Sequence, residues 1–152
     1  MEPMLDLLPY LQAEKELNRL ESRRQSEREQ IISGIYRQCE VIGGMPVTYS
    51  YPTEKAALEL VDIDGAYSTA IRRNEERVTV LNNALDTLIE SERKAFNVFI
   101  NSKGRAVSHE AYTALEKVRS FVVKYKEAKE AEQKQKRKEK LKEEIKKKGE
   151  KQ

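Results

Sequence analysis

The sequence has few of the residues that carry catalytic and metal chemistry: one histidine, one cysteine and no tryptophan among 152 residues. The single cysteine, Cys39, excludes an intrachain disulfide and a thiolate cluster, and it favours a reducing compartment. His109 has no second histidine to share a metal, and no glycine-rich phosphate loop is present. We therefore expect no enzyme, no cofactor and no metal site.

Long hydrophobic runs are also missing. No apolar segment approaches the ~20 residues that a membrane span requires. The first residues, Met1–Leu8, carry acids where a signal peptide needs positive charge. We expect a cytoplasmic, soluble protein that makes no membrane contact.

Helix-breaking residues are scarce, with six glycines and four prolines, and several of them lie between Gly43 and Pro52. Charged residues make up 36% of the chain and hydrophobic residues 38%, which leaves little for a globular core. The rest is rich in good helix formers. The sequence thus predicts an all-α, elongated protein built as a helical hairpin or coiled coil.

Four regions follow from this pattern. We predict an N-terminal helix over 1–40, a Gly/Pro/Tyr loop over 41–52, a long helix plus a C-terminal helix over 53–125, and a basic tail over 126–152. The pattern is helical from Thr53 to about Ile100, and around Ala70–Ile71 the helix should either change the face that it buries or bend, near Gly65 or Ile71. Gly104 can then supply a left-handed C-terminal cap, and Ser108 an N-cap for a helix ending near Tyr125. Polar positions inside the apolar stripes, at Arg24, Glu27 and Asn74, fit either an intramolecular hairpin or pairing between chains.

The charge of the chain is unevenly distributed. Residues 124–152 hold 13 Lys/Arg and 7 Asp/Glu, so this segment carries +6 while the residues before it carry −3. The basic tail, helical or disordered, has three interpretations: an arm that binds polyanions, a solubilising extension, or a helix that orders on a partner.

Two short runs resemble known transcription proteins. Ala84–Phe96 resembles the segment that opens the promoter-reading domain of bacterial sigma factors, which also occurs in late-gene transcription activators of Gram-positive phages. Tyr51–Leu60 is similar to the entry before the long helix in activators of the RinA and ArpU type. The resemblance implies a C-terminal DNA-reading module. Residues 101–107 are too few for the scaffold helix expected there, so a plain antiparallel helix pair is the alternative.

The helix that begins at Ser108 offers a candidate DNA-binding face. Its apolar stripe should face inward, which leaves a polar stripe on the opposite side with side chains suited to phosphates and base edges. Two cations before the helix, and one beside the stripe, add to it. The candidate nucleic-acid-binding residues are Lys103, Arg105, Thr113, Lys117, Arg119, Ser120 and Lys124. An ordinary solvated helix face has the same composition.

Two functions remain open. The first is a phage- or prophage-type transcription regulator, elongated and dimeric, that binds DNA or RNA polymerase without catalysis. The second is a coiled-coil adaptor or inhibitor that binds a host protein and makes no sequence-specific DNA contact.

Overall fold

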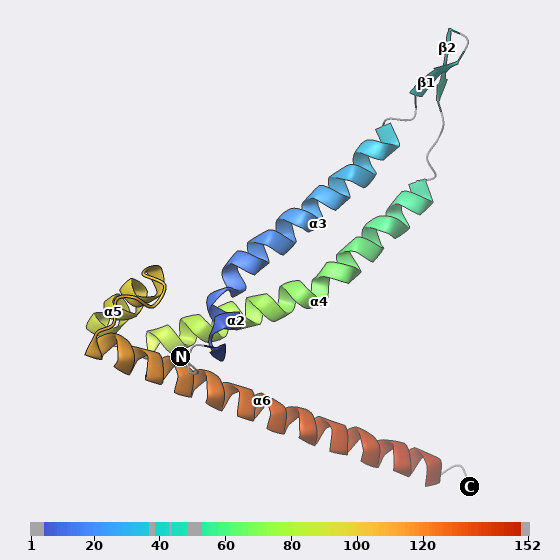
Figure 1. The fold of residues 1–152 in the computed structure, drawn as a ribbon. Helices are drawn as coiled ribbons and strands as arrows, with labels where there is room; N and C mark the ends of the chain where they lie inside the picture. Colours follow the sequence, from blue (N-terminus) through green and yellow to red (C-terminus); the bar gives the residue numbers. More distant parts are fainter. Residues whose placement is uncertain (1–4, 37–38, 43, 49–52, 150–152) are drawn as a thin grey trace. The chain divides into compact units, whose positions relative to one another are not determined.

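A computed structural model describes residues 5–36, 39–42, 44–48 and 53–149. Figure 1 shows the order of the elements along the chain. The predicted all-α class is confirmed, and a two-stranded hairpin is the only β-structure among the described residues. The elements are α2 (Leu8–Leu11), α3 (Ala13–Tyr36), β1 (Cys39–Ile42), β2 (Met45–Thr48), α4 (Thr53–Asp86), α5 (Glu90–Asn101) and α6 (His109–Gly149).

The chain divides into two compact units. One unit comprises Leu8–Thr79, and the other comprises Val80 onward together with the described residues up to Leu7. The first unit contains the helical hairpin and the strands. The second contains α5 and α6, and with them every candidate DNA-binding residue.

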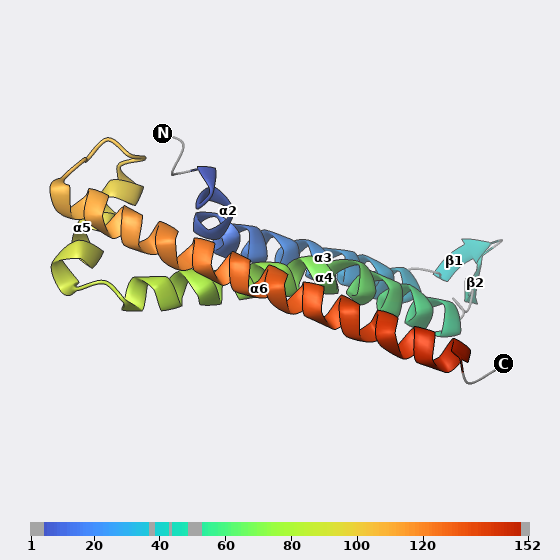
Figure 2. The same cartoon turned by 90° about the horizontal axis from the view of Figure 1, so that it is seen from below.

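The first unit is built on a helical hairpin. Helix α3 and the portion of α4 up to Thr79 lie side by side in both views (Figures 1 and 2). Polar contacts join them midway: Arg28 pairs with Asp64, and the hydroxyl of Tyr67 donates to the Glu27 carboxylate at 2.6 Å. The helical hairpin expected from the sequence is thus confirmed, and its polar middle consists of pairs between the two helices.

The predicted loop over 41–52 is wrong where the structure describes it, because part of it forms a β-hairpin. Strand β1 pairs antiparallel with β2, with Val41 opposite Pro46 and Ile42 opposite Met45. Gly44 has a φ of 84°, a backbone conformation that glycine adopts without steric cost. The predicted helix over 1–40 ends earlier, at Tyr36, since Cys39 already belongs to β1. Residues 49–52 of the predicted loop lie outside the described residues.

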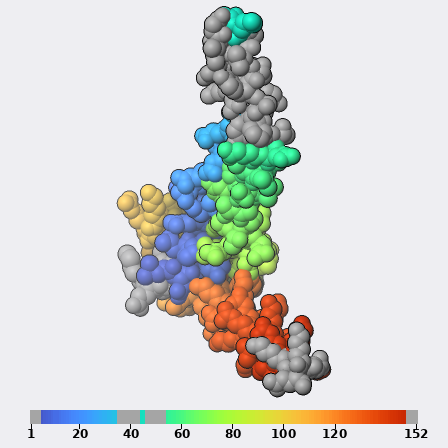
Figure 3. All heavy atoms as spheres, turned by 90° about the vertical axis from the view of Figure 1, so that its right-hand side faces the viewer, coloured from blue at the N-terminus to red at the C-terminus, as the bar shows by residue number. Residues whose placement is uncertain are grey.

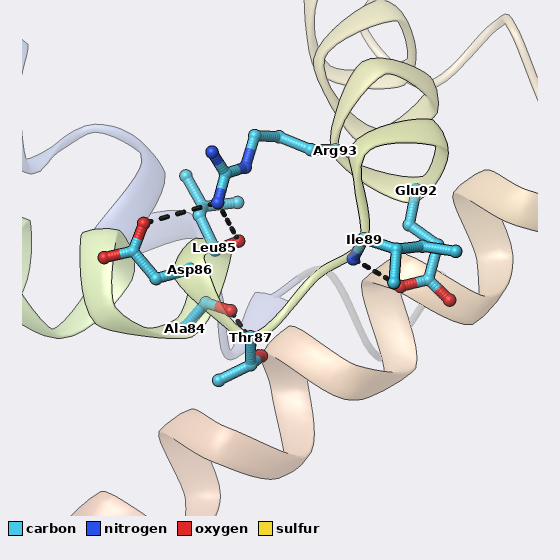
Figure 4. A network of polar contacts seen from close by, with 7 residues as sticks. All are labelled: Ala84, Leu85, Asp86, Thr87, Ile89, Glu92 and Arg93. Carbon is cyan, nitrogen blue, oxygen red and sulfur yellow. Dashed lines mark hydrogen bonds and ion pairs between the residues drawn. The ribbon is translucent and has the colours of Figure 1, made fainter.

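The helix predicted from Thr53 to about Ile100 is interrupted at a different place from the expected bend: α4 continues past Gly65 and Ile71, ends at Asp86, and α5 begins at Glu90. At the break, the hydroxyl of Thr87 donates to the carbonyl of Ala84 at 2.6 Å. The Ile89 amide donates to the Glu92 carboxylate at 3.3 Å, which satisfies an unpaired donor at the start of α5. Figure 4 shows these contacts around the turn.

Arg93 ties the two helices together across this break. Its guanidinium donates to the carbonyl of Leu85 at 3.0 Å and lies 3.3 Å from the carboxylate of Asp86 (Figure 4). The carbonyls at the end of a helix have no intrahelical partner, and a cation there also interacts favourably with the helix dipole. Arg93 therefore caps α4 from the first turn of α5.

Helix α6 is a single helix of 41 residues. The predicted division at residue 125 does not mark its end, because the helix continues through the basic segment to Gly149. Burial does change along it. Val118 and Val122 are fully buried, whereas every described side chain from Glu130 to Lys147 is exposed.

Candidate nucleic-acid interface

The candidate interface is supported by the packing of α5 against α6. Helix α5 contributes two aromatic side chains to this core, Phe96 at 2% exposure and Phe99 at 8%. Helix α6 presents small and branched apolar side chains at helical spacing. Those that are buried are Ala111, Ala114, Leu115, Val118 and Val122. The apolar stripe predicted from the sequence therefore faces the core, and the polar stripe is left outside.

The connection between α5 and α6 is a compact turn. Residues 102–108, all of which the structure describes, contain no helix. The amide of Gly104 donates to the carbonyl of Phe99 at 2.9 Å, and Gly104 has a φ of 80°. The Ser108 hydroxyl accepts the amide of Ala111 at 3.1 Å. The N-cap at Ser108 is thus confirmed. The left-handed residue directly after the C-cap Ser102 is Lys103, with a φ of 55°, and Gly104 follows it, so the C-terminal cap lies one residue before the predicted position.

A groove of about 550 Å³ follows the outer side of α6. It is lined by all four residues of the predicted polar stripe, Thr113, Lys117, Ser120 and Lys124. The structure adds three residues from nearby positions: Thr87 at the α4–α5 break, and Glu116 and Phe121 on α6. The predicted polar stripe of α6 therefore lines this groove.

The polar groups of this groove suit an anionic ligand. The ammonium groups of Lys117 and Lys124 provide positive charge, and the hydroxyls of Thr87, Thr113 and Ser120 are small hydrogen-bonding groups. Side chains of these types are among those that contact phosphates in protein–DNA complexes. Glu116 is the one acid among the lining residues, and its carboxylate opposes such a ligand.

Lys117 is held in place by a glutamate on α5. Its ammonium lies 2.6 Å from the Glu92 carboxylate, whose side chain is only 9% exposed while that of Lys117 is 47% exposed. The hydrogen bond from Lys117 lowers the pKa of Glu92, and the bond from the Ile89 amide acts in the same direction. Glu92 therefore does two things: it caps the start of α5 and fixes Lys117 at the edge of the groove.

The other three predicted residues lie apart from the groove. Lys103 and Arg105 are exposed in the α5–α6 connection, where Lys103 has a φ of 55°. Arg119 lies 3.6 Å from the Asp6 carboxylate, and its Nε is buried without a hydrogen-bond partner among the described residues. The structure thus brings four of the seven predicted residues together.

Sequence reasoning missed Thr87 and Glu92. Thr87 lies in the break between α4 and α5, which contains no glycine or proline. The local sequence therefore does not predict that Thr87 lines the groove. Glu92 offered a signal, because it falls at an apolar position of its helix between Leu88 and Phe96. A carboxylate at a core position usually needs a charged or hydrogen-bonding partner.

Comparisons with protein families, with curated proteins and with solved structures found no match for this chain. Within the described ranges, no group of three or more His, Cys, Asp or Glu side chains could hold a metal ion. Of the described helices, none combines the length and the apolar character needed to cross a membrane.

The Glu92–Lys117 pair predicts a specific pH dependence of stability. Because folding lowers the pKa of Glu92, the ionised carboxylate stabilises the fold at neutral pH. This contribution is lost as the pH falls below the ordinary glutamate range and through the lowered pKa. Glu92→Gln should therefore unfold more easily than wild type at pH 7, and the difference should shrink by pH 3. Urea denaturation at both values measures it.

Glu110→Gln is the matched control, since Glu110 is exposed in the first turn of α6. It should leave the pH profile of unfolding close to that of wild type. A Glu92→Gln variant whose deficit is the same at pH 3 and pH 7 would contradict a stabilising role for the ionised pair.

Proposed function

We propose that the protein is a non-catalytic, cytoplasmic transcription regulator of phage or prophage type whose α6 groove binds the phosphate backbone of duplex DNA. The observation that carries this proposal is the convergence of Thr113, Lys117, Ser120 and Lys124 on one groove. Two ammonium groups and neighbouring hydroxyls fit phosphate oxygens, and phosphate contacts supply most of the affinity of such proteins.

The resemblance of Ala84–Phe96 to sigma-factor and phage-activator sequences supports the same function. That run spans the end of α4, the break and most of the first two turns of α5. It leads directly into the helix pair that carries the groove. RNA polymerase, the partner of those proteins, is the second macromolecule that this surface is proposed to contact.

Two observations favour the rival function, an adaptor or inhibitor that binds a host protein. Residues 102–108 contain no helix, so α5 and α6 do not form the complete helix-turn-helix expected of a promoter reader. Lys117 also already neutralises Glu92, which reduces the charge it offers to a phosphate. The first observation weighs against base reading, and the second weighs against a phosphate contact by Lys117.

Fluorescence anisotropy with duplex DNA from upstream of the protein's own operon tests the proposal. The full chain should bind, and the logarithm of its affinity should fall linearly with the logarithm of salt concentration. Lys124→Gln and Lys117→Gln should each flatten this slope by about 1. Lys124 forms no ion pair among the described residues, so its variant is the cleaner of the two.

Lys94→Gln is the control, because Lys94 is 75% exposed on α5 and does not line the groove. It should leave both slope and affinity near those of wild type. Absence of binding, or binding that survives Lys117→Gln/Lys124→Gln unchanged, would remove the DNA function and leave the adaptor. Equal binding to a scrambled duplex would show that the groove contacts the backbone without reading the promoter.

A further inference from the structure

The C-terminal segment of α6 is helical although little packs against it. All described side chains from Glu130 to Lys147 are exposed. An isolated helix of this length is marginally stable in water, and exposed pairs such as Glu132–Lys136 add little to its stability. A surface that covers one face of the segment would stabilise it.

One face of this segment combines positive charge with apolar side chains. At about 100° per residue, Lys134, Lys138, Leu141, Lys142 and Ile145 share one side of the helix. Leu141 is 61% exposed and Ile145 is 64% exposed. The three lysines make no ion pair within the described part of the chain. The opposite side carries Glu132, Glu139 and Glu143.

A second exposed face, on the N-terminal half of α4, has the complementary character. Leu58 is 66% exposed and Val61 is 67% exposed. Glu54 and Asp62 lie beside them on the same side of the helix, and neither is ion-paired to another described residue. Figure 3 shows atoms of α4 in green and atoms of the end of α6 in orange and red on the side of the molecule that faces the viewer.

We propose that these two faces bind each other between two copies of the chain. Each face has an apolar pair at helical spacing, and the charges beside the two pairs are opposite. Glu54 and Asp62 are eight residues apart, as are Lys134 and Lys142, so both pairs span about 12 Å along their helices. Contact between them buries four exposed apolar side chains and pairs the charges.

The complementary character of the two faces identifies a second copy as the occupant. Each copy carries one α4 face and one α6 face. A two-fold dimer can therefore form the same contact twice and leave neither face without a partner. Nucleic acid fits the tail less well, because phosphates offer nothing to Leu141 and Ile145. This inference is independent of the DNA function proposed for the groove.

Sedimentation velocity of the nuclease-treated full chain tests the dimer over a range of concentrations and salt. Wild type should dimerise, more weakly at high salt. Leu141→Ser/Ile145→Ser should raise the dimer dissociation constant by roughly tenfold or more, since each lost apolar contact counts directly in the affinity. Lys134→Glu/Lys142→Glu should do the same, and so should Glu54→Lys/Asp62→Lys.

The decisive variant combines both charge reversals, because it restores opposite charges and should recover the dimer. Glu139→Lys/Glu143→Lys changes the charge on the opposite side of the same segment and should leave the dimer intact. A wild type that stays monomeric overturns the proposal, including the case in which the tail folds onto its own α4. The proposal is also overturned if none of the three disruptive variants changes the dimer dissociation constant, or if the association disappears on treatment with nuclease.

Discussion

Phe96→Ala should be among the most destabilising substitutions in the chain, lowering the free energy of unfolding by about 3–5 kcal/mol. Phe96 is 2% exposed and is the largest fully buried side chain. It lies on α5, a helix of only 12 residues whose stability depends on packing against α6. Removing the ring takes away its transfer free energy and leaves a cavity that the surrounding side chains fill only in part.

Chemical denaturation followed by circular dichroism measures this effect. Since domains are stable by only about 5–15 kcal/mol, the loss is a large fraction of the total. Val98→Ala is the control, because Val98 is 57% exposed on the same helix and should change stability by less than about 0.5 kcal/mol. Equal effects at the two positions would show that α5 does not pack as described.

Val118→Asp should destabilise the same core from the side of α6. Val118 is fully buried, and an ionised carboxylate there loses its hydration without gaining a partner. Burial should raise the pKa of the introduced carboxyl, so the defect should be largest at pH 7 and smaller near pH 4, where the side chain is protonated. We expect a loss of several kcal/mol at pH 7, at the upper end of measured point-mutant effects.

Two comparison variants separate charge from shape. Val118→Asn has the same shape without the charge, so its deficit should not depend on the aspartate pKa. Val107→Asp makes the same chemical change at a valine that is 72% exposed just before α6, and it should cost little. If Val118→Asp and Val107→Asp were equally stable at pH 7, the inward stripe of α6 would be misassigned.

These variants also control the DNA-binding experiment. Val118 is adjacent to Lys117 in sequence but faces the core, so its loss acts on binding only through unfolding. Lys124→Gln acts on an exposed side chain of the groove. A binding defect in Lys124→Gln with unchanged unfolding would therefore report the groove itself, whereas a binding defect that tracks stability would not.

The sequence predicts well the features that local chemistry determines. Ser108 caps α6 as expected, because an N-cap requires a short polar side chain that accepts a backbone amide. The turn at the end of α5 also falls where Gly104 predicts it, although the left-handed residue directly after the C-cap is Lys103. The inward stripe of α6 follows from helical periodicity alone. The groove-lining stripe follows from the same periodicity, since whatever faces away from the core must be the polar side.

Features that depend on distant contacts were not predictable in this way. The break between α4 and α5 contains no glycine or proline, and it is fixed by Arg93 and Glu92, which lie beyond it. Within the predicted loop over 41–52, Gly44 and Pro46 favour irregular structure. The structure instead places the β-branched residues Val41, Ile42 and Val47 in paired strands, with Gly44 in the turn between the strands.

Because α6 is a single helix, the angle about its axis between the groove and the basic and apolar face of its C-terminal segment is fixed. Lys124 lines the groove, and Lys134 begins the basic and apolar face ten residues later, a rotation of roughly 80° about the axis at 3.6 residues per turn. With no hinge between them, a ligand in the groove and a partner on the distal face approach from directions that the helix itself dictates. Inserting one residue between the two positions would turn one surface by about 100° against the other while leaving the side chains of both unchanged.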